Sequence, residues 1–148
     1  MTPFASATPA GRPLDHVGIA LESFVAADVY GALGWRAVAA DQDLADQGVR
    51  VRLLRGGPGP ALELLVPLGE AGPIARFLAR RGPGLHHLAY AVADLDAEMA
   101  RLAALGAPFV DARPRPGYGG HRVAFHRQQD DVDRHAAREQ PVGLGQQS

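Results

Sequence analysis

Two stretches of the chain repeat one pattern of apolar and polar positions. Residues 14–21 read Leu-Asp-His-Val-Gly-Ile-Ala-Leu, and residues 85–92 read Leu-His-His-Leu-Ala-Tyr-Ala-Val. Alternation along a strand puts the third residue of each stretch, His16 or His87, on one face together with glycine or alanine. A repeat of this kind indicates two copies of one supersecondary unit.

The first copy predicts a module of strand, helix and three further strands over residues 14–68. Ser23 can cap a helix that runs to about residue 33. That helix is expected to bury four apolar residues, Phe24, Val25, Val29 and Leu33. Strands are then predicted at residues 35–39, 49–55 and 61–66, and a short amphipathic helix over residues 73–81 links the modules.

The second copy predicts the same order over residues 84–126, except for its last strand. Asp94 can cap a helix that ends near Gly106, and strands follow at residues 109–110 and 122–126. The counterpart of strand 61–66 would fall near residues 132–138, which lack the alternation and branched residues of a buried strand. Residues 127–148 are therefore interpreted as a polar tail, and an exposed sheet edge is expected where the strand is missing. A shifted reading frame would produce such a change of character after Phe125.

Length and composition fit a single α+β domain over residues 14–126, made of two βαβββ modules and preceded by a loose arm, residues 1–13. The 148 residues suit two modules that share one core. The net charge of −1 gives no electrostatic reason to expect nucleic acid or an anionic membrane as partner, so a small molecule is expected. No signal peptide or membrane span of roughly 18 apolar residues is apparent, and a cytoplasmic location is expected.

The residues with candidate chemistry lie in the predicted strands. Small neighbours leave space around His16 and His87 that a packed core would not tolerate. Glu63 is the one polar residue in the strand 61–66, and a buried carboxylate is costly unless it is paired or bound to a cation. The chain has no cysteine, so nitrogen and oxygen must hold any metal. His16, Glu63 and His87 are predicted to bind one divalent ion, cobalt, manganese, nickel, iron or zinc.

Other readings of the histidines stay open. A single histidine in a strand is more often structural than a metal ligand, and a single strand glutamate usually faces solvent; the repeat is what favours a metal site here. Strand alternation puts His86 on the face opposite His87, where packing or surface roles are expected. His121 and His126 lie on or beside the strand 122–126, where a loop or solvent role is expected.

Several short motifs follow one another over about residues 14–125. They are Leu14-Asp-His-Val-Gly-Ile-Ala, Gln47-Gly-Val, Leu62-Glu-Leu-Leu-Val-Pro-Leu68, Pro73-Ile-Ala-Arg-Phe-Leu78, Gly84-Leu-His-His-Leu-Ala89, Pro114-Arg-Pro-Gly117 and Gly120-His-Arg-Val-Ala-Phe125. Taken in this order, they resemble the vicinal oxygen chelate superfamily, which includes glyoxalase I, extradiol dioxygenases and methylmalonyl-CoA epimerases, and the resemblance is strongest to the epimerases. Each motif is weak alone, and their order makes the set specific.

The resemblance implies a cup-shaped pair of sheets around one divalent ion, with His16, Glu63 and His87 as ligands. It implies inversion of the carbon alpha to the thioester of methylmalonyl-CoA through an enolate, hence an acyl-CoA substrate, and a homodimer. A cation at the developing oxyanion would contribute several kcal/mol to such a reaction. The alternatives are another glyoxalase-like isomerase or lyase, or a non-catalytic protein of the same fold that binds a small molecule.

The catalytic bases remain unassigned. Val51 stands where some family members carry, on the third strand, a glutamate that acts as a base. The family also ends on an apolar strand with a last ligating glutamate. Asp133, His135 and Glu139 are the nearby candidates here, and Glu139 is favoured because Gln140-Pro141 follows it.

Overall fold

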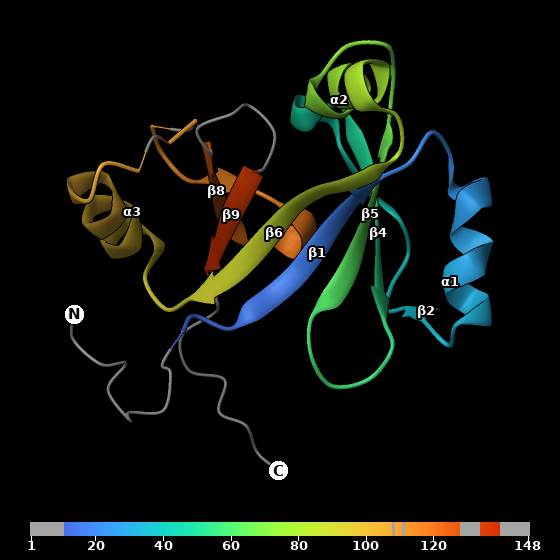
Figure 1. Cartoon of the computed structure of the whole chain (residues 1–148), viewed down its shortest axis with the longest axis horizontal. Helices are drawn as coiled ribbons and strands as arrows, with labels where there is room; N and C mark the ends of the chain where they lie inside the picture. Colours follow the sequence, from blue (N-terminus) through green and yellow to red (C-terminus); the bar gives the residue numbers. More distant parts are fainter. Residues whose placement is uncertain (1–10, 108, 111, 128–133, 140–148) are drawn as a thin grey trace, which may run out of the picture.

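The two repeated octapeptides form the pair of strands at the centre of the sheet. β1 (Leu14–Ala20) and β6 (Gly84–Val92) run antiparallel and side by side along the molecule (Figure 1). Each brings the histidine of its repeat to the middle of the pair: His16 lies opposite Ala89, and His87 lies opposite Gly18. The computed structural model describes residues 11–107, 109–110, 112–127 and 134–139.

The remaining strands are arranged symmetrically about this central pair. The sheet order is β2-β4-β5-β1-β6-β9-β8-β7. In each half the first strand of the module (β1 or β6) lies at the centre, the last strand (β5 or β9) pairs parallel with it, and the next strand outward (β4 or β8) is antiparallel. The bounds are β2 (Arg36–Ala37), β4 (Val49–Arg55), β5 (Ala61–Pro67), β7 (Arg115–Pro116), β8 (Arg122–Arg127) and β9 (Arg134–Glu139), while β3 (Gln42–Leu44) pairs with β4. The predicted α+β class and paired modules are confirmed.

The interpretation of the C-terminal region as a polar tail is wrong for residues 134–139. These residues form β9, which pairs parallel with β6 and antiparallel with β8. Because β9 lies between two strands, the exposed edge expected at this place is also wrong. Backbone hydrogen bonds to both neighbours do not depend on branched side chains, so the position in the sheet overrides a weak strand propensity. Residues 128–133, with the candidate Asp133, and residues 140–148 lie outside the described residues.

The first helical segment differs from its predicted form. It consists of a 3₁₀ turn, η1 (Phe24–Ala27), capped by the Ser23 hydroxyl that accepts from the Val25 N–H, followed by α1 (Asp28–Ala32). The expected burial of three apolar residues is wrong: Val25, Val29 and Leu33 are 81%, 56% and 69% exposed. A 3₁₀ turn holds three residues per turn, so it changes the phase of the helical pattern. Phe24 and Tyr30 pack on the sheet instead.

The other two helices follow the prediction. α2 (Pro73–Arg81) packs Ile74 and Leu78 on the first half-sheet, and α3 (Leu95–Ala104) begins after Asp94, whose carboxylate accepts from the Ala97 N–H at 3.0 Å. Two short 3₁₀ turns, η2 (Ala45–Gln47) and η3 (Tyr118–Gly120), complete the elements. No helix within the described part of the chain has the length and apolar character needed to cross a membrane.

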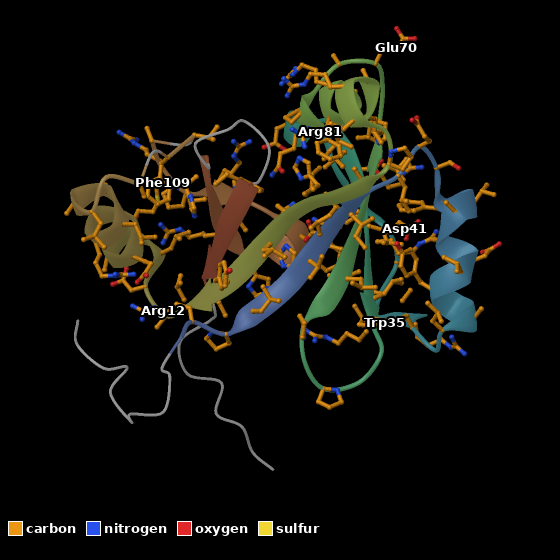
Figure 2. The ribbon with its side chains drawn as sticks, viewed as in Figure 1. Arg12, Trp35, Asp41, Glu70, Arg81 and Phe109 are labelled. Carbon is orange, nitrogen blue, oxygen red and sulfur yellow. The ribbon has the colours of Figure 1, made fainter. Side chains whose placement is uncertain are left out.

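The helices of the two modules lie at opposite ends of the molecule (Figure 1). Trp35 and Asp41 lie on the α1 side of the first half-sheet, and Phe109 lies on the α3 side of the second (Figure 2). Separate apolar clusters fill these layers, one around Leu54 and Leu64 and another around Leu95 of α3 and Ala124 of β8. The inner surface of the sheet is thereby left to line a pocket.

Candidate metal-binding site

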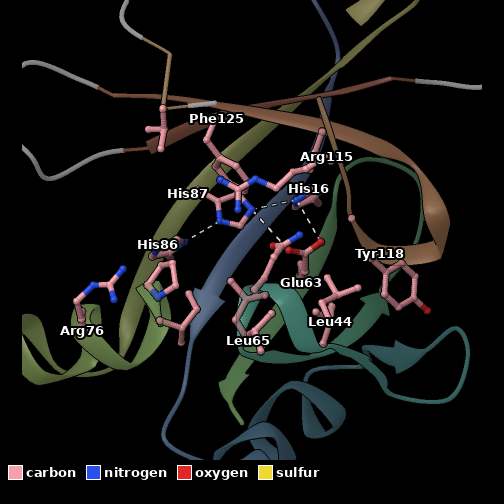
Figure 3. A pocket seen from close by; sticks show the side chains of 18 residues that line it. His16, Leu44, Glu63, Leu65, Arg76, His86, His87, Arg115, Tyr118 and Phe125 are labelled. Carbon is pink, nitrogen blue, oxygen red and sulfur yellow. Dashed lines mark hydrogen bonds and ion pairs between the residues drawn. The ribbon is translucent and has the colours of Figure 1, made fainter. Parts of the chain in front are cut away.

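Three side chains from three different strands converge in this pocket (Figure 3). His16 comes from β1, His87 from β6 and Glu63 from β5. Each offers one nitrogen or oxygen atom, and these atoms all lie within 4.8 Å of one another. The sequence-predicted set is therefore brought together, although its members are far apart along the chain.

The distances within the cluster suit a shared cation. The two Nε2 atoms of His16 and His87 are 3.1 Å apart. The carboxylate of Glu63 lies 3.3 Å from His16 Nε2 and 3.6 Å from His87 Nε2. Both histidines are only 4% exposed, and the Glu63 side chain is 13% exposed. An anionic oxygen and two imidazole nitrogens thus face one another with little access to solvent.

Gly18 makes room for this arrangement. It lies opposite His87 on the neighbouring strand and beside Glu63 on the other. A Cβ atom at this position would overlap the imidazole ring of His87. The small residue noted in the repeat is therefore required by the close approach of a side chain rather than by backbone conformation.

The Nδ1 atoms of both histidines also have buried partners. His16 Nδ1 lies 2.8 Å from the carboxylate of Asp15, and His87 Nδ1 lies 2.9 Å from Nδ1 of His86. The Asp15 side chain is 7% exposed, and His86 is 6% exposed. Each histidine of the cluster is thus held from behind by the residue that precedes it in the chain.

The expectation that His86 points away from His87 is wrong. His86 lines the same pocket, and its ring packs edge-on against Phe77. The cause is a bulge: Gly18 pairs with His87 but Ile19 pairs with Leu85, which leaves His86 as an extra residue on β6. A bulge breaks the alternation of a strand, so two consecutive side chains can reach one side.

The pocket wall is mostly apolar and carries two guanidinium groups. Val51, the residue where some family members carry a glutamate, is 1% exposed and lines the pocket. Arg76, Arg115 and Tyr118 also line it (Figure 3). Sequence reasoning did not single out these three, because they lie on α2, on β7 and in η3, and only the fold brings those elements to one cavity.

Two hydrogen bonds tie the loop of the second module to the first module beside the pocket. The side-chain amide of Gln47 donates to the Pro116 carbonyl at 2.8 Å, and the Gly119 N–H donates to the Gln42 side chain at 2.8 Å. These contacts hold Arg115 and Tyr118 on the same cavity as Glu63.

Two further histidines lie outside the pocket. His121 follows η3, and His126 packs edge-on against Phe109 with ring centres 5.9 Å apart; neither lines the pocket. His135 and Glu139 belong to β9, where they are paired with Leu88 and Val92 of β6.

Comparison with known proteins agrees with this geometry. Residues 15–125 match the Glyoxalase/Bleomycin resistance protein/Dioxygenase superfamily. An ethylmalonyl-CoA/methylmalonyl-CoA epimerase of Cereibacter sphaeroides is 39% identical over 121 residues, which are 79% of this chain and 89% of that protein.

Solved structures of epimerases are also similar. Methylmalonyl-CoA epimerase from Mycobacterium tuberculosis has a TM-score of 0.82 at 34% identity, covering 92% of this chain and 94% of its own. A Streptomyces coelicolor methylmalonyl-CoA epimerase variant in complex with 2-nitronate-propionyl-CoA has a TM-score of 0.80 at 30% identity, covering 88% and 99%. The resemblance to methylmalonyl-CoA epimerases found in the motifs is confirmed, and the chain belongs to the glyoxalase/bleomycin resistance protein/dioxygenase superfamily.

Proposed function

We propose that this protein is a metal-dependent epimerase that inverts the carbon alpha to the thioester of methylmalonyl-CoA. The observation that carries the proposal is the cluster of His16, Glu63 and His87, which lines a pocket and has both histidines buried. The 39% identity to an ethylmalonyl-CoA/methylmalonyl-CoA epimerase supports the choice of substrate.

The residues of the cluster fit a divalent ion. Two imidazole nitrogens and one carboxylate oxygen are donors suited to cobalt, manganese, nickel, iron or zinc. His16 already donates its Nδ1–H to Asp15, which leaves the Nε2 lone pair directed at the cluster. His16, Glu63 and His87 would hold the ion, whose positive charge would stabilise the negative charge that develops on the thioester oxygen.

The other pocket residues would bind and orient the substrate. The guanidinium groups of Arg76 and Arg115 suit the carboxylate and the phosphates of an acyl-CoA. The apolar wall around Val51 and Leu65 keeps water from the reacting carbon and so strengthens every charge interaction there.

Inversion also needs proton transfer at the alpha carbon. Val51 cannot take part, and arginine does not release its proton in proteins. Among the described residues that line the pocket, His86 and Tyr118 are the groups outside the cluster that can exchange a proton. We propose these two as the first positions to test for the acid and base, in preference to Glu139, whose strand position is paired with Val92.

We also propose a homodimer that acts in the cytoplasm. The exposed sheet edge no longer supports the dimer, because β9 fills that position. Resemblance to the epimerases is the remaining support, and the molar mass measured by light scattering tests it against the monomer mass of 15.6 kDa.

Deuterium exchange tests the proposed activity. The metal-loaded protein is incubated with methylmalonyl-CoA in heavy water, and deuterium at the alpha carbon is followed by mass spectrometry. We expect exchange and inversion with the wild type, and neither with His16→Ala. Metal binding without exchange would overturn the epimerase proposal and favour a non-catalytic binding protein. Turnover of a different oxoacid or thiohemiacetal substrate would favour another glyoxalase-like isomerase or lyase.

A further inference from the structure

The partners of the two cluster histidines occupy equivalent places in the repeat. Asp15 precedes His16 in the first octapeptide, and His86 precedes His87 in the second. Each contacts the Nδ1 atom of the histidine that follows it, at 2.8 Å and 2.9 Å. The repeat has therefore kept the contact and changed its chemistry, from a carboxylate to an imidazole.

This change makes the two cluster histidines chemically unequal. An ionised carboxylate can only accept, so Asp15 requires the proton of neutral His16 to be on Nδ1 and the lone pair on Nε2. An imidazole nitrogen can either donate or accept, so His86 permits His87 to hold its proton on Nδ1 or on Nε2. One histidine is fixed in a single tautomer and the other is free to change.

Without a cation, the contacts form a chain of hydrogen bonds with one direction. Neutral His16 has a lone pair on Nε2, 3.1 Å from His87 Nε2, and the carboxylate of Glu63 lies 3.6 Å from the same His87 atom, so His87 faces two acceptors and donates from Nε2. His87 Nδ1 then accepts from the Nδ1–H of His86. The protons are ordered from His86 through His87 and His16 to the carboxylate of Asp15.

To offer a lone pair to a cation, His87 must move its proton from Nε2 to Nδ1. The contact with His86 then reverses: His87 Nδ1–H donates, and His86 accepts at Nδ1 and carries its own proton on Nε2. The three imidazoles hold the same number of protons in both arrangements, so the change transfers no net charge. Both rings are almost fully buried, so the change of tautomer takes place away from bulk solvent.

We propose that Asp15 and His86 are positioning residues for the two cluster histidines, and that His86 exchanges donor and acceptor roles with His87 when a metal binds. Asp15 keeps the Nε2 lone pair of His16 available to the metal, and His86 allows His87 to shift its proton to Nδ1 so that its Nε2 lone pair also becomes available. The proposal rests on the proposed metal site. Partners of this kind, which orient a ligand without touching the metal, typically contribute about 10–100-fold to metal affinity.

The tautomers are measured directly by long-range ¹H–¹⁵N correlation spectra of the histidine rings, with and without zinc. We expect His16 to carry its proton on Nδ1 in both spectra, and His87 to change from Nε2–H to Nδ1–H when zinc is added. A His87 tautomer that is Nδ1–H without zinc would overturn the proposal. If the wild type takes up no zinc, the proposed function fails, and the zinc-free spectrum still decides between the two tautomers of His87.

Two variants of His86 provide the second readout. Glutamine offers both an amide donor and a carbonyl acceptor, so His86→Gln should keep a zinc affinity close to that of the wild type. Leucine can neither donate nor accept a hydrogen bond, so His86→Leu should bind zinc about 10–100-fold more weakly than the wild type. His121→Leu, which removes a histidine outside the pocket, is the matched control and should leave the affinity unchanged. Equal affinity in His86→Leu and the wild type would overturn the proposal.

The register of β9 carries a second, independent inference about the number of ligands. In the first module, Glu63 of β5 is paired with Gly18 of β1. The repeat places Ala89 of β6 where Gly18 stands in β1, and Ala89 is paired with Ala136 of β9. Ala136 thus holds in the second module the position of Glu63 in the first, and alanine has no ligand atom.

We infer that, among the residues that the structure describes, the second module supplies His87 alone to the site, and that a carboxylate at position 136 would complete it. Ala136→Glu should bind zinc at least about tenfold more tightly than the wild type. Ala137→Glu adds the same charge one residue along the strand, at the position paired with Tyr90 of β6, and should not bind zinc more tightly than the wild type. Equal affinities for the two variants would overturn this inference. If Ala136→Glu takes up zinc and the wild type does not, the result would support this inference and contradict a metal site in the wild type.

Discussion

Nε2 of His16 lies 3.1 Å from Nε2 of His87, across the boundary between two copies of one structural unit. The contact joins the central strands of the two half-sheets, so the site exists only when both modules are folded together. Glu63, from the first module, contacts both histidines and completes the cluster.

Removing any member of the cluster should abolish tight metal retention. His16→Ala and His87→Ala each remove a nitrogen donor, and Glu63→Gln removes the anionic charge while it keeps the shape. Elemental analysis of the purified variants measures the metal to protein ratio. His126→Ala, outside the pocket, is the control, and unchanged metal content in the first two variants would refute the ligand assignment.

Gly18→Ala should displace His87 while leaving the three proposed ligand residues unsubstituted. The added methyl group overlaps the imidazole ring, so we expect weaker metal binding and a loss of about 1–3 kcal/mol in the free energy of unfolding. Gly31→Ala in α1 meets no neighbouring atom and is the matched control, with stability unchanged or raised by up to about 1 kcal/mol. Titration with cobalt and urea unfolding measure the two effects, and wild-type behaviour of Gly18→Ala would contradict the close approach.

Arg115→Ala should weaken the binding of acyl-CoA and leave metal affinity unchanged, because Arg115 lines the pocket but is not one of the three cluster residues. We expect a higher KM for methylmalonyl-CoA than that of the wild type, with a smaller change in kcat. Arg122→Ala removes an exposed arginine that pairs with Asp96 away from the pocket, and it serves as the control. A KM equal to that of the wild type in Arg115→Ala would exclude this arginine from substrate binding.

The ion pair between Asp41 and Arg52 should stabilise the fold in a pH-dependent way. Two hydrogen bonds from Arg52, at 2.8 and 2.9 Å, lower the pKa of Asp41 from its ordinary value of 3.8. The contribution is therefore complete above pH 3.8 and is lost as the pH falls through the lowered pKa. Both side chains are 29% exposed, so we expect Asp41→Asn to cost at most about 1 kcal/mol at neutral pH. Urea unfolding should show no difference from wild type once Asp41 is protonated, and a difference that grows in acid would contradict this account.

The cluster was predictable because a repeat and strand alternation together place residues on a face. His16 and His87 follow from that rule, and Glu63 was predicted because it is the one polar residue of its strand. His86 did not, because a bulge is a local departure from pairing that the sequence does not mark. Val29 and its apolar neighbours on the first helical segment were misplaced for a similar reason, since a 3₁₀ turn changes the helical phase.

Features that depend on tertiary position could not be read from the sequence. β9 has a poor strand sequence and is held by neighbours on both sides, and Arg115 reaches the pocket through a loop fixed by hydrogen bonds such as that from Gln47 to Pro116. Propensity and alternation describe the chain locally, and neither carries information about which distant segments meet.

Anomalous scattering from crystals of the cobalt-loaded protein locates the metal ion without reference to activity. We expect one strong peak bounded by His16 Nε2, His87 Nε2 and the carboxylate of Glu63. The absence of a peak there, or a peak at other residues, would contradict the assignment of this cluster as the metal site.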